Sequence, residues 1–267
     1  MVSPILSLGK NHKQEKNKKL LIIENLSKRF GSFYALQNIS LSIPEANIVL
    51  LIGPNGSGKT TLINCISGVY IPEEGKIWFN GQDITGKPPH EIVKIGISRS
   101  FQIPEPFKKL TVAENLLLCS LNNPGESFLN SLSKNLWKKY EKFLIDKMFN
   151  ILKVIGLEDK IDTLAEELSG GQLKLLELGR LLMLDSKLML LDEPIGGINP
   201  LLANEILFYI KKIKDAFGTS FLIVEHRLDI IMKYVDYVHV LFRGNLVASG
   251  TPEEVTRKKE LYDIYLI

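Results

Sequence analysis

The sequence feature that most constrains the fold is an apolar run followed directly by a glycine-rich loop and a helical pattern. Residues 48–52 read IVLLI, residues 53–60 read GPNGSGKT, and helical periodicity continues to Ile66. An unbroken apolar run of this length is typical of a strand buried on both faces. The loop matches G-x-x-x-x-G-K-[ST], whose glycines let successive backbone N–H groups point at phosphate oxygens. The sequence therefore predicts a phosphate-binding loop between a buried strand and a helix.

This loop also predicts individual ligand contacts. By composition alone, a chain of this length would contain the pattern by chance about 1% of the time, so an ordinary glycine-rich turn is the weaker interpretation. We expect Lys59 to bring positive charge to the β and γ phosphates, and Thr60 to offer its hydroxyl to magnesium. The residues assigned to this nucleotide site are Gly53, Pro54, Asn55, Gly56, Ser57, Gly58, Lys59, Thr60 and Thr61.

Strand and helix patterns alternate along much of the chain, which predicts an α/β fold with a mostly parallel sheet. The periodicity is helical almost throughout residues 111–184, and again over residues 59–66 and 201–217. An Asn-Gly pair at residues 80–81 predicts a hairpin turn. Strands are expected at residues 20–24, 33–36, 41–43, 48–52, 76–79, 97–101, 188–191, 221–224, 237–242 and 246–248.

One long helix is expected near residues 130–155. Its apolar positions recur at roughly helical spacing, and most of them are expected to lie in the core, with a few left to contact a partner. These positions are Leu132, Leu136, Trp137, Tyr140, Phe143, Leu144, Phe149 and Leu152.

The charge of the chain is concentrated near its N-terminus. The net charge is +3, and residues 10–19 hold five lysines against one glutamate. This polar stretch lacks periodicity, so residues 1–19 are expected to form a disordered basic arm outside the fold. The remainder is nearly neutral, which argues against a nucleic-acid partner. No uncharged apolar run approaches the roughly 18 residues that span a bilayer, and the two cysteines, Cys65 and Cys119, form no metal-binding or disulfide pattern.

A carboxylate is needed near the magnesium of a phosphate-binding loop, and residues 190–194, LLDEP, offer two. Asp192 ends an apolar strand and is assigned to magnesium. Glu193 follows it and is placed to polarise a water toward the γ-phosphate as general base, provided that the two side chains straddle the strand end. Without the glycine-rich loop, Asp192 would pass for an acidic turn residue and Glu193 for a surface glutamate.

A second glycine-containing segment, residues 168–172, reads LSGGQ. Ser169 and Gln172 alone form a capping box for the following helix, and locally this is the better interpretation. It leaves Gly170 and Gly171 unexplained, because glycine in the first turn weakens a helix. Exposed N–H groups there would make a second anion site.

The order of these motifs resembles that of the ATP-binding-cassette (ABC) ATPases, over residues 20–267. The resemblance implies a P-loop NTPase fold of ABC type: a RecA-like core, an antiparallel β subdomain, a helical subdomain inserted at about residues 103–184, and a C-terminal helix at about residues 252–266. It also implies that LSGGQ of one subunit, with Ser169, Gly170, Gly171 and Gln172, closes over ATP and Mg²⁺ held by the P-loop of another.

Three further residues take roles from this resemblance. Gln102, in SRSFQ, resembles the glutamine that reaches magnesium and communicates with a membrane partner. His226, in IVEH, resembles the histidine that contacts the γ-phosphate, although a lone histidine after a strand is more often structural. Phe30 resembles the aromatic residue that stacks on adenine, and the residues alone favour a core role for it.

The sequence departs from the family pattern at Asn199, where an aspartate usually stands. Asn199 is expected to cap the helix that Pro200 opens. The same segment, residues 195–200, together with residues 99–102, 225–229, 250–254 and 261–266, resembles the ATP-binding subunits of branched-chain amino acid importers.

These resemblances imply an ATP-hydrolysing importer subunit on the cytoplasmic face of the membrane. Its expected partners are transmembrane permease subunits, a second ATPase subunit of the same or a related chain, and, indirectly, an extracytoplasmic substrate-binding protein. Two other classes remain open. One is an ABC ATPase that serves a soluble complex such as an iron–sulfur assembly scaffold. The other, a module that binds ATP without hydrolysing it, is disfavoured by Glu193 and His226.

Overall fold

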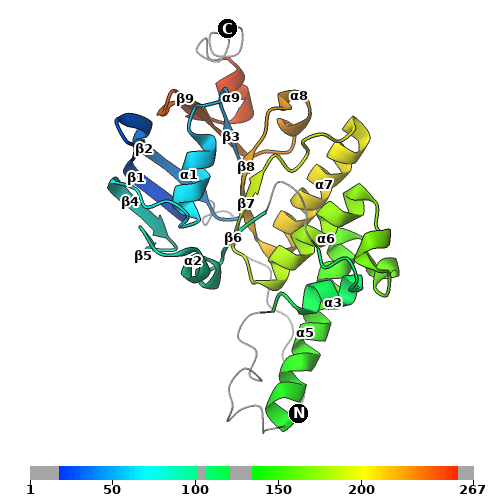
Figure 1. Cartoon of the computed structure of the whole chain (residues 1–267). Helices are drawn as coiled ribbons and strands as arrows, with labels where there is room; N and C mark the ends of the chain where they lie inside the picture. Colours follow the sequence, from blue (N-terminus) through cyan, green and yellow to red (C-terminus); the bar gives the residue numbers. More distant parts are fainter. Residues whose placement is uncertain (1–17, 101–105, 121–133, 258–267) are drawn as a thin grey trace, which may run out of the picture.

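The computed structural model describes residues 18–100, 106–120 and 134–257. Two sheets lie side by side, and helices cover the outer face of the larger one (Figure 1). Gln102, most of the expected basic arm and residues 258–267 lie outside the described residues. Of the expected C-terminal helix, the described part is α9 (Pro252–Thr256). Within the described ranges, no helix combines the length and the apolar character needed to cross a bilayer.

The smaller sheet is antiparallel and contains β1 (Lys19–Phe30), β2 (Phe33–Pro44), β4 (Glu74–Phe79) and β5 (Gln82–Asp83), in the order β2-β1-β4-β5. The strands predicted separately at residues 33–36 and 41–43 are one strand, because irregular register with β1 carries the pairing through the polar residues between them. The predicted Asn80-Gly81 turn is confirmed, since both residues have positive φ, 48° and 80°, as a type I′ hairpin turn requires.

The larger sheet contains β3 (Ile48–Ile52), β6 (Ile97–Arg99), β7 (Leu188–Asp192), β8 (Ser220–Val224), β9 (Tyr237–Phe242) and β10 (Asn245–Gly250). Its order is β10-β9-β3-β8-β7-β6, and only β10 is antiparallel to its neighbour. The mostly parallel sheet is thus confirmed. Because parallel strands end at one edge, the residues that follow β3, β7 and β8 meet there.

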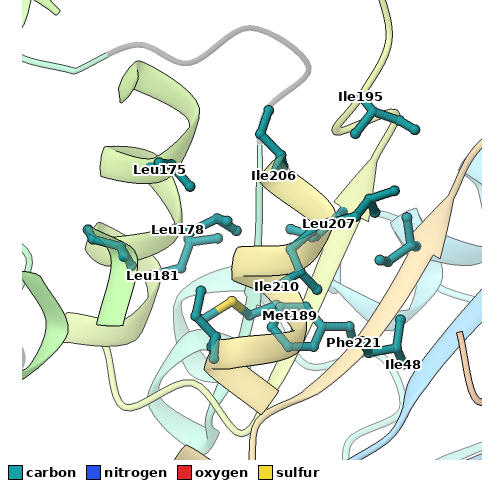
Figure 2. Packing of buried hydrophobic residues seen from close by; sticks show 14 of the residues in the cluster. Ile48, Leu175, Leu178, Leu181, Met189, Ile195, Ile206, Leu207, Ile210 and Phe221 are labelled. Atoms are coloured by element: carbon teal, nitrogen blue, oxygen red, sulfur yellow. The ribbon is translucent and has the colours of Figure 1, made fainter. Parts of the chain in front are cut away.

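Alternate residues of β3 face two separate cores. Val49 and Leu51 pack with the small sheet and α1 (Lys59–Ile66), the helix predicted at these residues. Ile48, Leu50 and Ile52 pack on the opposite side with α6 (Gly170–Met183) and α7 (Pro200–Phe217). Figure 2 shows this second core, where Ile206, Leu207 and Ile210 of α7 lie between α6 and the sheet. In the described ranges, the remaining helical segments are α2 (Pro89–Ile95), α3 (Val112–Leu117), α5 (Lys134–Ile155), α8 (Leu228–Ile231) and the 3₁₀ turns Glu158–Lys160 and Ala165–Glu167.

Helix starts follow the local signals in the sequence. The predicted capping boxes at Thr111 and Ser169 are both present, each with a side chain that accepts the N3 backbone hydrogen bond. Asn199 caps α7, where its Oδ1 accepts from the N–H of Leu202 at 2.9 Å. These ends are therefore fixed locally, independently of the packing behind them.

The expectation that most apolar positions of the long helix are core is wrong for the described side chains. Within α5, Phe143 and Phe149 are 56% and 52% exposed, and of the positions predicted only Leu152 is buried. The buried face instead consists of Met148, Ile151, Leu152 and Ile155. The apolar residues of this helix form a face wider than the stripe that meets the core, so their spacing could not indicate which of them are buried.

A buried histidine between the two sheets predicts a loss of stability in acid. His239 of β9 is 3% exposed, and its ring nitrogens contact Ser249 Oγ at 2.7 Å and the carbonyl of Ser42 at 3.2 Å. Burial lowers the pKa of His239 from 6.5 to about 4. The folded state therefore keeps the ring neutral, whereas the unfolded state binds a proton below pH 6.5, so stability falls as the pH drops from 6.5 toward 4.

We expect the wild-type chain to lose about 2 kcal/mol more unfolding free energy between pH 7.5 and pH 5 than the His239→Gln variant. Urea unfolding of both proteins at the two pH values measures this difference. Equal losses in both proteins would show that His239 is not the responsible group.

Candidate functional site

The loop between β3 and α1 is shaped by glycines in close contact with other backbone. Gly53 has φ +155°, and a Cβ there would lie 2.2 Å from the carbonyl oxygen of Leu241. Gly58 has φ +104°, and its Cβ would lie 2.6 Å from the carbonyl oxygen of Ala35 in β2. A Cβ added to Gly244, in the β9–β10 turn, would lie 2.9 Å from the same Ala35 carbonyl oxygen. The loop therefore occupies a fixed place between the two sheets.

Lys59 lies at the first position of α1 and is 6% exposed. Its ammonium donates to the carbonyls of Gly53 and Pro54 at 2.8 and 3.0 Å. Burial lowers the pKa of Lys59, while the charges of Glu193 and Asp192 oppose that shift. The ammonium thus lies within the loop and in the field of both carboxylates.

The neighbouring hydroxyls differ in exposure. Ser57 is 2% exposed, and its Oγ finds no hydrogen-bond partner within the described part of the chain. A buried hydroxyl without a partner costs free energy, so a ligand oxygen that reaches it would be stabilised. Thr60 is exposed in the first turn of α1, and Thr61 beside it is half-buried. Both threonines follow the helix N-terminus, where a phosphate is favoured electrostatically.

Asp192 ends β7 beside an arginine. Arg99 at the end of β6 approaches its carboxylate, with Nη2 3.7 Å from Oδ2. Arg99 also donates to the side-chain oxygen of Asn64 in α1. Burial raises the pKa of Asp192, and the nearby Arg99 guanidinium opposes this. The carboxylate is half-buried at the sheet edge that also carries Lys59.

Glu193 and His226 follow adjacent strands and meet. Glu193 N–H donates to the carbonyl of Val224 at 2.9 Å, and Glu193 has a φ of 51°, which is unusual for a residue other than glycine. Its Oε1 lies 3.2 Å from Nε2 of His226, and both side chains remain about a third exposed. The strained backbone of Glu193 therefore aims its carboxylate at the imidazole, within reach of solvent.

The LSGGQ segment lies away from this cluster. Ser169 caps α6, and Gly170 is exposed at its first turn. A Cβ on Gly171 would lie 2.3 Å from Leu202 of α7, so close helix packing accounts for that glycine. Because α1 and α6 pack on opposite faces of the sheet, one chain does not bring Gly170 to its own P-loop (Figure 1).

Phe30 is the last residue of β1, in the small sheet, which lies on the same side of the larger sheet as α1. Its ring is 46% exposed and packs edge-on against Tyr70, with centroids 5.3 Å apart. The ammonium of Lys28 lies 5.4 Å from the ring centroid. The core role favoured by the residues alone is therefore wrong, since this much of the ring faces solvent.

Sequence reasoning assigned no role to Arg99, Lys174 or Glu225, which contact the site residues. Lys174 of α6 donates to the carbonyl of Pro194 at 2.6 Å. Glu225, directly after the buried strand β8, is 1% exposed and accepts from backbone N–H groups. An acidic residue between the apolar run at residues 221–224 and a histidine is the signal that could have drawn attention to it.

A groove lies between α2, β6, α6 and the segment that follows α3, next to the end of β6. Its volume is about 350 Å³, and most of its lining is apolar. Among the residues that line it are Val69, Ile92, Val93, Cys119, Arg180 and Leu181. Arg99 also lines this groove, so a single side chain links it to Asp192.

Comparison with curated proteins gives archaeal and bacterial relatives that match over nearly all of the chain. LivG of Archaeoglobus fulgidus, a probable branched-chain amino acid transport ATP-binding protein, is 47% identical over 93% of this chain and 95% of its own. The protein of the same description from Methanocaldococcus jannaschii is 45% identical over 92% and 97%. The high-affinity branched-chain amino acid transport ATP-binding protein LivG of Escherichia coli K12 is 32% identical over 92% of this chain and 97% of its own.

Solved structures and a protein-family model agree with these relatives. A nucleotide-free ATP-binding cassette from an ABC transporter has a TM-score of 0.77 and 44% identity, over 92% of this chain and 98% of that chain. The ADP form of another such cassette has a TM-score of 0.78 and 41% identity, over 94% of this chain and 99% of that chain. The family model described as ABC transporter matches residues 36–196, from β2 to the loop after Glu193. The chain therefore belongs to the ABC transporter family, as one of its ATP-binding cassettes.

Proposed function

We propose that this chain binds ATP with Mg²⁺ at the sheet edge that carries Lys59, Asp192, Glu193 and His226, and hydrolyses it to drive an importer. The observation that carries the proposal is the convergence of these four side chains from the ends of β3, β7 and β8. The buried Ser57 hydroxyl, which has no hydrogen-bond partner among the described residues, and the positive end of α1 suit a phosphate chain. Phe30 offers an exposed aromatic face to the adenine.

The donor set also suits magnesium. Mg²⁺ is usually held by one or two carboxylates together with substrate phosphates. Thr60 and Asp192 would supply the protein ligands, with Gln102 assigned beside them by the resemblance. No three histidine, cysteine or acidic side chains in the described ranges cluster to hold a metal alone. When bound, the ion neutralises charge on the β and γ phosphates.

Glu193 is the proposed general base for hydrolysis. Its carboxylate accepts a proton from the attacking water as the water oxygen bonds to the γ-phosphorus, and the bond from that phosphorus to the β–γ bridging oxygen breaks. Lys59 stabilises the charge that develops on the leaving ADP. His226, paired with Glu193 at 3.2 Å, contacts the γ-phosphate. Glu193, Lys59 and His226 would take these roles from the positions that they occupy at the sheet edge.

Two chains are needed to complete each site in this proposal. Ser169, Gly170, Gly171 and Gln172 of one chain would close over the nucleotide on the P-loop of the other, because within one chain the two surfaces lie on opposite faces of the sheet. ATP would hold the pair closed, and hydrolysis would release it.

We expect the Glu193→Gln variant to be a dimer with ATP and Mg²⁺ and a monomer with ADP. Size-exclusion chromatography with light scattering measures the mass directly. A Gly170→Glu change in the same variant, which puts a negative charge at the open first turn of α6, is expected to prevent the dimer without altering ATP binding. A monomer in every condition, with ATP binding confirmed, would contradict a homodimer and favour a dimer with a related ATPase subunit.

The permease is proposed to dock at the groove between α2, β6, α6 and the segment that follows α3. The groove is apolar, adjoins the helical subdomain predicted at residues 103–184, and reaches Asp192 through Arg99. Motion of that subdomain during closure would thus be felt by a helix seated in the groove. Such a partner would hold this chain on the inner face of the cell membrane, peripheral to it.

The transported substrate is proposed to be a branched-chain amino acid, because relatives at 47% and 45% identity carry that description. Cells that lack this gene should take up radiolabelled leucine, isoleucine and valine far more slowly, with glutamate uptake unchanged. Restored uptake with the wild-type gene but not with Glu193→Gln would tie transport to hydrolysis. Normal uptake in the deletion strain, with no second copy of the gene, would contradict this substrate class.

A further inference from the structure

Glu225 is a buried carboxylate that binds backbone from two different loops. Its Oε1 accepts from the N–H of Ile195 at 2.8 Å, and its Oε2 accepts from the N–H of His226 at 3.1 Å. The N–H of Arg227 also donates to this carboxylate. Glu225 is 1% exposed, and its burial raises the pKa of the carboxyl while these three N–H groups oppose that shift. One side chain therefore joins the loop after β7 to the loop after β8.

These bonds run alongside the pair proposed for catalysis. Asp192 and Val224 are register partners in β7 and β8, so the two loops leave the sheet together. Glu193, from the β7 loop, extends its side chain to His226 in the β8 loop. Glu225, from the β8 loop, extends its side chain to Ile195 in the β7 loop. The two glutamates thus form reciprocal links, one exposed to solvent and one buried.

Two cations hold the same β7 loop at other points. Lys174 of α6 donates to the carbonyl of Pro194 at 2.6 Å. Arg227 Nη1 donates to the carbonyl of Ile198 at 2.8 Å. Besides the Glu193–His226 pair, the loop is thus bonded to the β8 loop at Ile195 and Ile198, and to the LSGGQ helix at Pro194. Its backbone therefore has little freedom to move apart from His226.

We propose that Glu225 is a positioning residue for ATP hydrolysis, whose carboxylate fixes the β7 loop against the β8 loop and so sets the approach of Glu193 to His226. The inference rests on the base role of Glu193 proposed above. Glu225 itself touches none of the reacting atoms.

The carboxylate is chemically suited to this task, and its nearest replacements are not. Ionised, it is only an acceptor, with two oxygens for three N–H donors. Glutamine puts an NH₂ donor where one oxygen was, so a buried N–H of Ile195 or His226 faces another donor. Aspartate keeps the charge but is one methylene shorter, so it cannot span both loops at the same backbone separation.

The test combines steady-state kinetics with a double-mutant cycle. Glu225→Gln is expected to lower kcat for ATP hydrolysis by about 10- to 100-fold, because small misplacements of catalytic groups have effects of this size. KM and the affinity for a fluorescent ATP analogue should stay within about twofold, because Glu225 does not contact the phosphates. In the Glu193→Gln background, single-turnover hydrolysis should not fall further when Glu225→Gln is added.

Several outcomes would overturn the proposal. An unchanged kcat in Glu225→Gln would do so. A further full loss of the single-turnover rate in the Glu193→Gln background, or a loss of ATP affinity as large as the loss of kcat, would also overturn it. If Glu225→Gln does not fold, as judged by its thermal transition, Glu225→Asp takes its place with the same expected kcat loss. The exposed Glu205→Gln is the matched control. Failure of the base role itself is recognised separately, since Glu193→Gln alone would then hydrolyse ATP at the wild-type rate.

Discussion

Replacing Glu193 by glutamine is expected to slow ATP hydrolysis by about 10²- to 10⁴-fold, the usual contribution of a positioned general base. Glutamine keeps the size and a hydrogen-bond acceptor near His226 but cannot take a proton from water at neutral pH. Lys59, Ser57 and the N-terminus of α1 are untouched, so ATP affinity should be retained. Phosphate release and equilibrium binding of ATP, measured on the same preparation, separate these two effects.

The matched control for this variant is Glu205→Gln. Glu205 is exposed on α7, carries the same charge and is not among the residues assigned to the site. It should hydrolyse ATP at the wild-type rate. Substantial turnover by Glu193→Gln, with the control normal, would assign the base role to another group or to the phosphate itself.

The second large effect is expected from Gly53→Ala. A Cβ at this position would lie 2.2 Å from the carbonyl oxygen of Leu241 and 2.6 Å from Ser57 Oγ, at a φ of +155°. The backbone oxygen belongs to β9 and cannot rotate away, so the loop must shift. Overpacking and backbone strain together should cost roughly 3 kcal/mol. This corresponds to a fall in Tm of about 6–12 °C.

Nucleotide binding should fail more severely than folding in this variant, because the displaced loop is the one proposed to hold the phosphates. Thermal unfolding and ATP-analogue binding are the two measurements. Gly31→Ala is the control, since Gly31 also has positive φ, +61°, but nothing lies within 4 Å of its Cβ. It should cost only about 1 kcal/mol. Equal effects of the two changes would show that positive φ, and not the contact with Leu241, limits the loop.

The parts of the fold that depend on local sequence were predictable. The strand at residues 48–52 and helix α1 have the boundaries expected, because an apolar run, a glycine loop and a helical pattern follow one another without ambiguity. The caps at Thr111, Ser169 and Asn199 were also predictable, since a cap is formed by residues three positions apart. Such features need no knowledge of distant neighbours.

The parts that failed depend on tertiary contacts. The face of α5 that meets the core is set by α6, α7 and α3, so the exposure of Phe143 and Phe149 could not be derived from spacing. Glu225 was passed over because its partners, Ile195 and His226, lie in two loops that only the β7–β8 pairing brings together. For the two glycines of LSGGQ, the sequence predicts only a role in binding an anion. In the structure, Gly171 also permits the close approach of the Leu202 side chain.

The meeting of Gly58 and Gly244 at the carbonyl of Ala35 has a consequence for selectivity. Ala35 belongs to the sheet that carries Phe30, while Gly58 belongs to the loop that is proposed to hold the phosphates. The N–H of Gln37 donates to Gly244 at 2.7 Å, and the N–H of Gly244 donates to Ser57 at 3.0 Å, so this junction is also bonded. The distance between Phe30, which is proposed to stack on the adenine, and the loop proposed to hold the phosphates is therefore fixed by these backbone contacts. We therefore expect the proposed site to favour ATP over inorganic triphosphate, which could contact the loop but not Phe30.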